Sequence, residues 1–296
     1  MAPLKTLTRP DTRGTAPQPA GVRLSGVVHE VFRERSQPLI GGDVRLAQDM
    51  LRAYGRADEF ASFLARTGNS FIAMSDRLLT RLPEPLPELD AVLLAYQSPD
   101  LYYSDVAGCY LAQLPGAPVP CSVAEQGPGA PFTALRIADG MARLGELRHG
   151  ALFVYDQNAA VWEANEEVQR RPDAAVLLAL DGDGDGDVLV TALDEVRTRE
   201  EDDPTPAEAL EQAVAAHGGP AVLIGPSLAA AVAGSPVADR VTAAPDEACC
   251  TGVWAELGRR LPLTEPLLLA DHDSAAGRFH SCLLVPAGAP EEDRLP

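Results

Sequence analysis

The stretch LALDGDGDGDVLV at residues 178–190 places four aspartates, separated by glycines, between two apolar runs. A calcium loop of the EF-hand type would use Asp181, Asp183 and Asp185 as its first, third and fifth ligands. Its twelfth position is Ala192 instead of a bidentate glutamate, and strands rather than helices are expected on both sides. Asp-Gly pairs between apolar runs are typical of hairpin turns, because glycine adopts positive φ without steric cost. The tract therefore predicts a hairpin between two strands rather than a calcium site.

Short apolar runs alternate with amphipathic stretches along the rest of the chain. Strands are expected over residues 22–31, 90–96, 119–124, 150–155, 173–180, 187–193, 221–225, 266–270 and 281–286. Helices are expected over residues 43–54, 57–66, 105–113, 133–147, 164–171, 205–217 and 252–261. This alternation indicates an α/β fold with largely parallel sheets.

The same order of elements returns near residue 171, which indicates an internal duplication. We therefore expect two similar halves, over residues 21–170 and 171–290. They lie between a flexible leader at residues 1–20 and a disordered tail at residues 291–296.

Composition limits the classes of partner. The 296 residues are 46% hydrophobic, enough for a sizeable core, and the net charge of −19 argues against nucleic acid or an anionic membrane as a partner. No apolar run is long enough for a membrane span, and the N-terminal stretch lacks the apolar section of a secretory signal. The five cysteines show no zinc-type spacing. A cytoplasmic protein without a metal site is therefore expected.

Several segments, in this order along the chain, resemble ketoacyl synthase III enzymes of the thiolase-like superfamily. They are FLARTGNSFIA (63–73), DAVLLAYQSPD (90–100), AGCYLAQLPGA (107–117), the helix and strand of 133–162, the Asp-Gly tract of 173–190 and PLLLADHDSAAGRFHSCLLV (266–285). The resemblance covers roughly residues 21–286. It implies the thiolase-like fold, an α/β architecture of two βαβαβαββ halves stacked in five layers, and assembly as a dimer.

The resemblance also implies where the chemistry should be. Members of the family hold a cysteine nucleophile at the start of a buried helix, where backbone N–H groups favour a thiolate and an oxyanion. A histidine and an asparagine complete the set. In this chain the cysteine position falls on Pro128 and the histidine position on Pro226. The asparagine position falls in the segment from Asp246 to Thr251, and no asparagine follows Asn165. None of the three catalytic residues is therefore expected here.

Other polar residues near these positions are candidates for relocated chemistry. Glu125 would be an acid in a buried pocket, Cys250 a nucleophile, and His272, between two carboxylates, a general base. Simpler interpretations are a helix cap, a packing thiol and a residue in a solvated turn, respectively. The residues expected to contact a substrate are Gln126, Gly127, Gly129, Ser227, Asp271 and Asp273.

The sequence leaves more than one function open. The first is a non-condensing pseudoenzyme of a bacterial fatty-acid or polyketide-type natural-product pathway, assembled as a homodimer or with an active ketosynthase homologue, as chain-length-factor subunits are. The second is an acyl- or aminoacyl-thioester transferase or hydrolase with relocated catalytic residues, and a structural or ligand-sensing module is a third.

The first two functions imply an acyl-CoA or a carrier-protein phosphopantetheine thioester as ligand, with no other cofactor. An acidic acyl carrier protein would then need a local group of arginines. The arginines considered for this role are Arg143, Arg148, Arg170 and Arg171.

Overall fold

The structure is a computed structural model that describes residues 21–35, 37–38, 44–64, 67–102, 106–116, 120–158, 170–182, 184, 186–245 and 248–288. The expected leader and tail, most of the expected helix at 164–171, and Asp183, Asp185 and Asp246 lie outside these residues. Each helix within the described ranges is too short or too polar to cross a bilayer.

Ten strands form one mixed sheet in the order β10-β9-β11-β12-β8-β1-β7-β6-β4-β5. The strands of its first half are β1 (Arg23–Phe32), β4 (Ala91–Tyr96), β5 (Pro120–Ala124), β6 (His149–Asp156) and β7 (Asp173–Asp181). Those of its second half are β8 (Val188–Arg197), β9 (Ala221–Ile224), β10 (Val241–Ala243), β11 (Leu267–Asp273) and β12 (Arg278–Pro286). Two further short strands, β2 (Gln37–Pro38) and β3 (Thr67–Gly68), pair with each other.

The two halves have the same topology. If the strands of each half are numbered one to five along the chain, both halves have the spatial order 3-2-4-5-1. In both, the second strand is parallel to the third and fourth, and the fifth is antiparallel to its neighbours. The predicted α/β fold with duplicated halves is confirmed. The expectation of largely parallel sheets is wrong, because β7 and β12 each contribute two antiparallel pairings.

The Asp-Gly tract is a turn between β7 and β8, but these strands are not hairpin partners. β1 lies between them and pairs with both, so the predicted hairpin is wrong. The Gly184 N–H donates a hydrogen bond to Asp181 Oδ1 at 2.8 Å, which shapes the turn. A Cβ at Gly182 would lie 1.9 Å from the Leu147 carbonyl oxygen, so this glycine allows close backbone approach. Since β7 is the fifth strand of the first half, the repeats divide at this turn rather than at residue 171.

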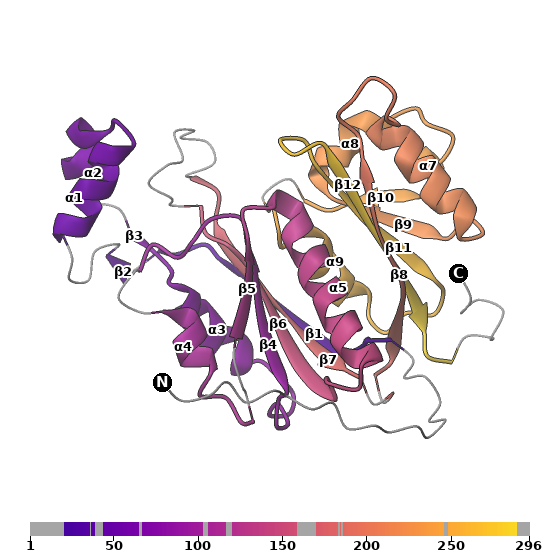
Figure 1. Cartoon of the computed structure of the whole chain (residues 1–296), viewed down its shortest axis with the longest axis horizontal. Coiled ribbons are helices and arrows are strands. Elements are labelled where there is room, and N and C mark those ends of the chain that lie inside the picture. Colours follow the sequence, from indigo (N-terminus) through magenta and orange to yellow (C-terminus); the bar gives the residue numbers. More distant parts are fainter. Residues whose placement is uncertain are drawn as a thin grey trace, which may run out of the picture.

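The helices complete a stack of five layers (Figure 1). Their bounds are α1 (Val44–Ala53), α2 (Phe60–Leu64), α3 (Phe71–Leu79), α4 (Ala107–Leu111), α5 (Ala130–Arg143), α7 (Pro206–Ala216), α8 (Pro226–Val232) and α9 (Gly252–Arg260). Helices α5 and α9 fill the centre between the two half-sheets, whereas α3 and α4 cover the outer face of the first and α7 and α8 that of the second.

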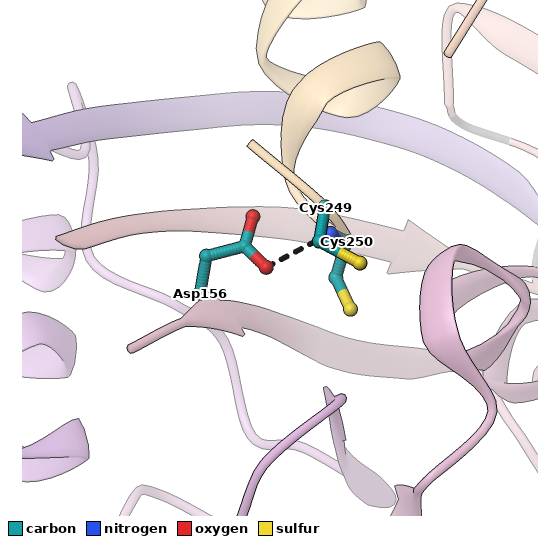
Figure 2. A group of neighbouring side chains, drawn as sticks. All are labelled: Asp156, Cys249 and Cys250. Atoms are coloured by element: carbon teal, nitrogen blue, oxygen red, sulfur yellow. Dashed lines mark hydrogen bonds between the residues drawn. The ribbon is translucent and has the colours of Figure 1, made fainter. Parts of the chain in front are cut away.

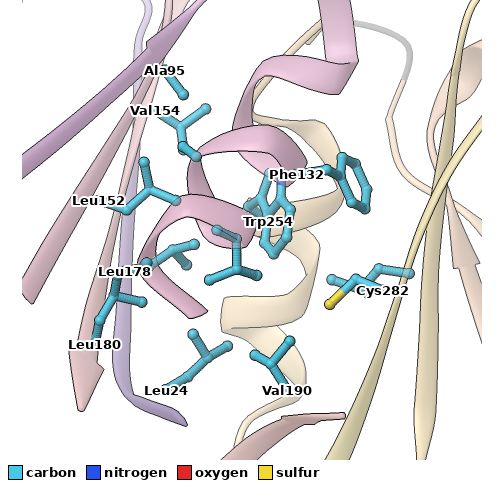
Figure 3. Packing of buried hydrophobic residues seen from close by; sticks show 14 of the residues in the cluster. Leu24, Ala95, Phe132, Leu152, Val154, Leu178, Leu180, Val190, Trp254 and Cys282 are labelled. Carbon is cyan, nitrogen blue, oxygen red and sulfur yellow. The ribbon is translucent and has the colours of Figure 1, made fainter. Parts of the chain in front are cut away.

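The central layer holds the largest apolar cluster, to which both halves contribute (Figure 3). Phe132 of α5 and Trp254 of α9 are fully buried, and their ring centroids are 5.0 Å apart. Complete burial of a large apolar side chain contributes about 1.5–3 kcal/mol to stability. This packing fixes the N-terminal ends of α5 and α9, which carry two of the positions singled out in the sequence.

Candidate functional site

A cavity of about 380 Å³ lies where the connections β5–α5, β9–α8, β10–α9 and β11–β12 meet. Its lining includes all three regions to which the family resemblance assigns catalytic residues. The residues that matter here are Gln97, Gly127, Pro128, Arg171, Pro226, Ser227, Cys249, Asp271, His272, Asp273 and Ser274. The three predicted catalytic positions are far apart in the sequence, and they lie at one cavity.

Pro128 lies in the 3₁₀ turn Gly127–Gly129 that leads into α5. It contributes neither a thiol nor a backbone N–H to the cavity wall. The glycines beside it let two side chains approach closely: a Cβ at Gly129 would lie 2.3 Å from His280 Nε2, and one at Gly127 would lie 3.1 Å from Asp273. Gly127 also has a φ of +49°, which favours glycine. This wall of the cavity is shaped by the absence of side chains.

Two predicted site residues before this turn do not line the cavity. Glu125 is exposed, with a left-handed φ of 61°. Gln126 is also exposed, and its Oε1 accepts a hydrogen bond from Thr133 Oγ1 at 2.7 Å. Gln97, which follows β4, lines the cavity instead. The structure therefore keeps Glu125 away from the buried, apolar surroundings that its role as an acid requires.

A buried aspartate, Asp271 of β11, also lies in the cavity wall. Asp271 Oδ1 accepts hydrogen bonds from Ser227 Oγ at 2.6 Å and from the His272 backbone N–H at 2.8 Å. Burial raises the pKa of Asp271 to about 7, and the nearby negative charges of Asp156 and Asp273 add to the rise. A carboxyl group with such a pKa can exchange a proton near neutral pH. Of the predicted substrate contacts, Ser227 and Asp271 thus form a hydrogen-bonded pair in the cavity wall.

His272 and Asp273 border the cavity but are held by turn contacts. His272 Nε2 lies 3.0 Å from Thr198 Oγ1, and burial lowers the pKa of His272. Asp273 Oδ1 accepts hydrogen bonds from the N–H groups of Ala275 and Ala276 at 2.9 and 3.0 Å. The β11–β12 turn is therefore built around the Asp273 carboxylate, while the His272 imidazole stays at the cavity.

The two vicinal cysteines occupy different environments. Cys249 is exposed and lines the cavity, whereas Cys250 is buried and its thiol donates a hydrogen bond to the Gly127 carbonyl oxygen at 3.2 Å. A hydrogen bond with Cys249, together with burial, raises the pKa of Cys250 well above its usual value. Because the thiolate is the nucleophile, Cys250 is poorly suited to the nucleophilic role considered for it. Cys249 is the member of the pair that a cavity ligand can reach.

Sequence reasoning missed Asp156, the last residue of β6. It is 4% exposed, and it accepts hydrogen bonds from the backbone N–H groups of Cys250 and Thr251, both at 2.9 Å, and from Thr251 Oγ1 at 2.6 Å. These contacts hold the start of α9. The available signal was a carboxylate that ends the buried run GALFVYD, although its partners lie about a hundred residues further along the chain.

His280 of β12 lies next to Gly129. It is 2% exposed, and within the described residues its Nδ1 has no hydrogen-bond partner. Burial lowers the pKa of His280 to about 4, and the charge of Arg136 adds to this shift. The ring stacks on Phe132, with centroids 5.8 Å apart. A neutral imidazole therefore packs against Gly129 and the start of α5.

The four arginines considered for carrier-protein binding occupy different places. Arg171 lines the cavity. Arg143 forms an ion pair with Asp139 at 2.7 Å, at the end of α5 that lies about 21 Å from its start. Arg148 forms an ion pair with Asp90 at 3.4 Å. Arg171 is therefore placed to meet a charged group at the cavity, whereas Arg143 lies at the far end of α5 and Arg170 is exposed outside the cavity lining.

No protein-family model and no curated protein sequence matches this chain. Solved structures match it in fold. OleA from Xanthomonas campestris, with bound lauric acid and lauroyl-CoA, superposes with a TM-score of 0.58 at 12% identity, over 90% of this chain and 99% of that one. AbyA1, a tetronic acid condensing enzyme, superposes with a TM-score of 0.58 at 14% identity, over 89% of this chain and 99% of that one. The chain therefore has a thiolase-like fold.

Proposed function

We propose that this chain is a non-condensing protein that binds an acyl thioester and serves a natural-product pathway of the fatty-acid or polyketide type. The observation that carries the proposal is the pair of prolines, Pro128 and Pro226, in the cavity wall. Pro128 provides no nucleophile and no N–H group for an oxyanion, and Pro226 provides no imidazole. The catalytic positions implied by the resemblance thus lack the groups that Claisen condensation uses.

The cavity supports the choice of ligand class. A volume of about 380 Å³ is within the range of small-molecule sites, which span about 300–1,000 Å³. OleA, which shares the fold, has been solved with bound lauroyl-CoA. Arg171 at the cavity offers a cation for the phosphates of CoA or of phosphopantetheine. An acyl-CoA or a carrier-protein thioester is therefore the ligand we propose.

The edge of the sheet supports the choice of partner. Strand β5 is at one end of the ten-stranded order and carries the exposed residues Cys121 and Ser122. An uncovered edge strand presents unpaired N–H and C=O groups to another strand. Pairing through β5 with a second copy or with an active ketosynthase homologue would place two cavities in one assembly.

Ligand binding can be tested by calorimetry with lauroyl-CoA. Ser274 is exposed at the cavity lining, so Ser274→Trp should narrow the entrance and weaken binding about tenfold or more, while Ala276→Trp, an exposed residue of the same turn outside the lining, should not. Equal loss in both variants, or no saturable binding by the wild type, would contradict the proposal.

The pathway role needs a second experiment. The purified chain is mixed with an active ketosynthase from the same genome, and association and product chain lengths are measured. We expect a stable complex and a shifted product distribution. If the chain neither associates with the ketosynthase nor changes its products, the partner role fails.

A second candidate function, thioester transfer or hydrolysis by relocated residues, is favoured by the Ser227–Asp271 pair. The pKa of about 7 for Asp271 suits a general base, and its Oδ1 is 2.6 Å from Ser227 Oγ. This function predicts that Ser227→Ala and Asp271→Asn each abolish CoA release from an acyl-CoA. Absence of CoA release by the wild type would exclude it.

A further inference from the structure

Three groups of the kind that bind metal ions converge beside the cavity. An oxygen of Asp156 and the sulfur atoms of Cys249 and Cys250 all lie within 4.8 Å of one another. Figure 2 shows the three side chains. Asp156 comes from the end of β6 in the first half, and the cysteines come from the connection β10–α9 in the second. The fold, rather than a local motif, thus brings one carboxylate and two thiols together.

The carboxylate is held in place by the residues beside the thiols. Asp156 Oδ1 accepts one hydrogen bond, from the Cys250 N–H, and Oδ2 accepts two, from the N–H and hydroxyl of Thr251. An ionised carboxylate has about four acceptor positions, so these three bonds leave one lone pair on Oδ1. Hydrogen bonds of this kind are the usual support of a ligating carboxylate, because they fix its orientation.

The two thiols differ in their access to the cavity. Cys250 is buried against the Gly127 carbonyl, whereas Cys249 is exposed and lines the cavity. In tetrahedral coordination with bonds of about 2.3 Å, sulfur ligands are about 3.8 Å apart, so small side-chain rotations bring the three atoms to bonding distance. A fourth position would then face the cavity.

We propose that Asp156, Cys249 and Cys250 bind a thiophilic divalent cation such as Zn²⁺ in the wall of the cavity. Binding exchanges the two S–H protons for two metal–sulfur bonds and releases both protons to solvent. Two thiolates and one carboxylate favour zinc over magnesium or calcium, which prefer oxygen ligands alone. Three protein ligands with a fourth position open to the cavity form a site that can bind water or a ligand heteroatom. This inference does not depend on the proposed function.

The test is a titration of the reduced, chelator-treated full chain with Co²⁺ and Zn²⁺. Co²⁺ should produce thiolate-to-cobalt charge-transfer absorption that saturates at about one equivalent, and Zn²⁺ should abolish it by displacement. Cys249→Ser and Cys250→Ser should each weaken binding at least tenfold. Cys121→Ser removes an exposed cysteine of β5 outside the cluster and should leave the titration unchanged.

The variants also separate specific binding from other outcomes. Cys249 is exposed, so Cys249→Ser is expected to fold like the wild type, which circular dichroism checks. Asp156→Asn tests the carboxylate ligand, but it also alters the hydrogen bonds that hold the start of α9. The two cysteine variants therefore determine whether the proposed metal site exists. Absence of saturable cobalt absorption in the wild type, or the same absorption in the Cys249→Ser and Cys250→Ser variants, would overturn the proposal.

Discussion

The connections β5–α5 and β10–α9 occupy equivalent places in the two halves, and they differ completely in chemistry. Each follows the third strand of its half and leads into a helix of the central layer. The first contains Gly127, Pro128 and Gly129, whereas the second contains Cys249 and Cys250. The duplicated fold therefore places the starts of both helices at one cavity, and the side chains alone decide what each can do there.

The two connections are also stabilised in different ways. The first relies on missing side chains, since His280 occupies the space that a Cβ at Gly129 would need. The second relies on a buried carboxyl group, since Asp156 accepts the N–H groups of Cys250 and Thr251. We therefore expect the first to be sensitive to added volume and the second to loss of the carboxylate.

Loss of the carboxylate should have the largest effect. Asp156→Ala leaves two buried N–H groups and a hydroxyl without their acceptor, and we expect a loss of at least about 3 kcal/mol in the free energy of unfolding. Asp90→Ala is the matched control, because Asp90 accepts the N–H groups of Arg148 and His149 at a more exposed position. Urea unfolding measures both. A cost for Asp156→Ala no larger than that for Asp90→Ala would remove the contrast between the connections.

The stability of the protein should also depend on pH through Asp271, which lies in the cavity wall beside Ser227. Its pKa is about 7 in the fold, above the usual 3.8, so its contribution to stability is complete below pH 3.8 and is lost as pH rises toward 7. Asp271→Asn should therefore be more stable than the wild type at pH 8 and gain little at pH 4. Unfolding curves across this range give the answer, and equal effects at both pH values would be the contrary result.

His280, which lies next to Gly129 of the β5–α5 connection, should give the opposite dependence of stability on pH. Because its pKa is lowered from 6.5 to about 4, its contribution is complete above pH 6.5 and is lost as pH falls toward 4. His280→Gln should thus flatten the acid side of the stability profile and leave the alkaline side unchanged. An unchanged acid side would show that the imidazole is not the titrating group.

Added volume at the first connection should have the smallest of these effects. In Gly129→Ala the new Cβ would lie 2.3 Å from His280 Nε2, and we expect a cost of about 1–2 kcal/mol from overpacking. Gly140→Ala is the matched control within α5, because a Cβ at Gly140 meets nothing within 4 Å. That control should stabilise the protein by up to about 1 kcal/mol, since alanine favours a helix over glycine. Thermal unfolding distinguishes the two, and equal effects would contradict the packing account.

Much of the fold could be predicted from periodicity. Continuous apolar runs such as DAVLLAY and GALFVY predict buried strands, and they are β4 and β6. The segment beginning TP predicts the start of α7, where Thr205 and Glu208 form a capping box. The short, largely exposed strand β10 and the helices α3 and α8 were missed, although Ser70 accepts a hydrogen bond from the Ala73 N–H at the start of α3. Such short elements are formed by tertiary packing more than by their own pattern.

The site was harder to predict than the fold. The resemblance was needed to place Pro128, Pro226 and the cysteine segment together, because no local pattern joins residues so far apart. Burial also decides chemistry that residue type leaves open: Cys250 turns inward, whereas Cys249 faces the cavity. Asp156 supports the second connection only because the fold brings the end of β6 next to the start of α9. The periodicity of apolar residues in the sequence cannot predict that contact.

The central claim is that this thiolase-like cavity holds an acyl thioester without condensing it. The most direct measurement follows the reduced wild type with lauroyl-CoA and malonyl-CoA by intact-protein mass spectrometry, release of free CoA and product analysis. We predict saturable binding of lauroyl-CoA, no acyl adduct on the protein, no CoA release and no β-keto product. An acyl adduct together with a β-keto product would show that the chain condenses despite Pro128 and Pro226, and would contradict the account.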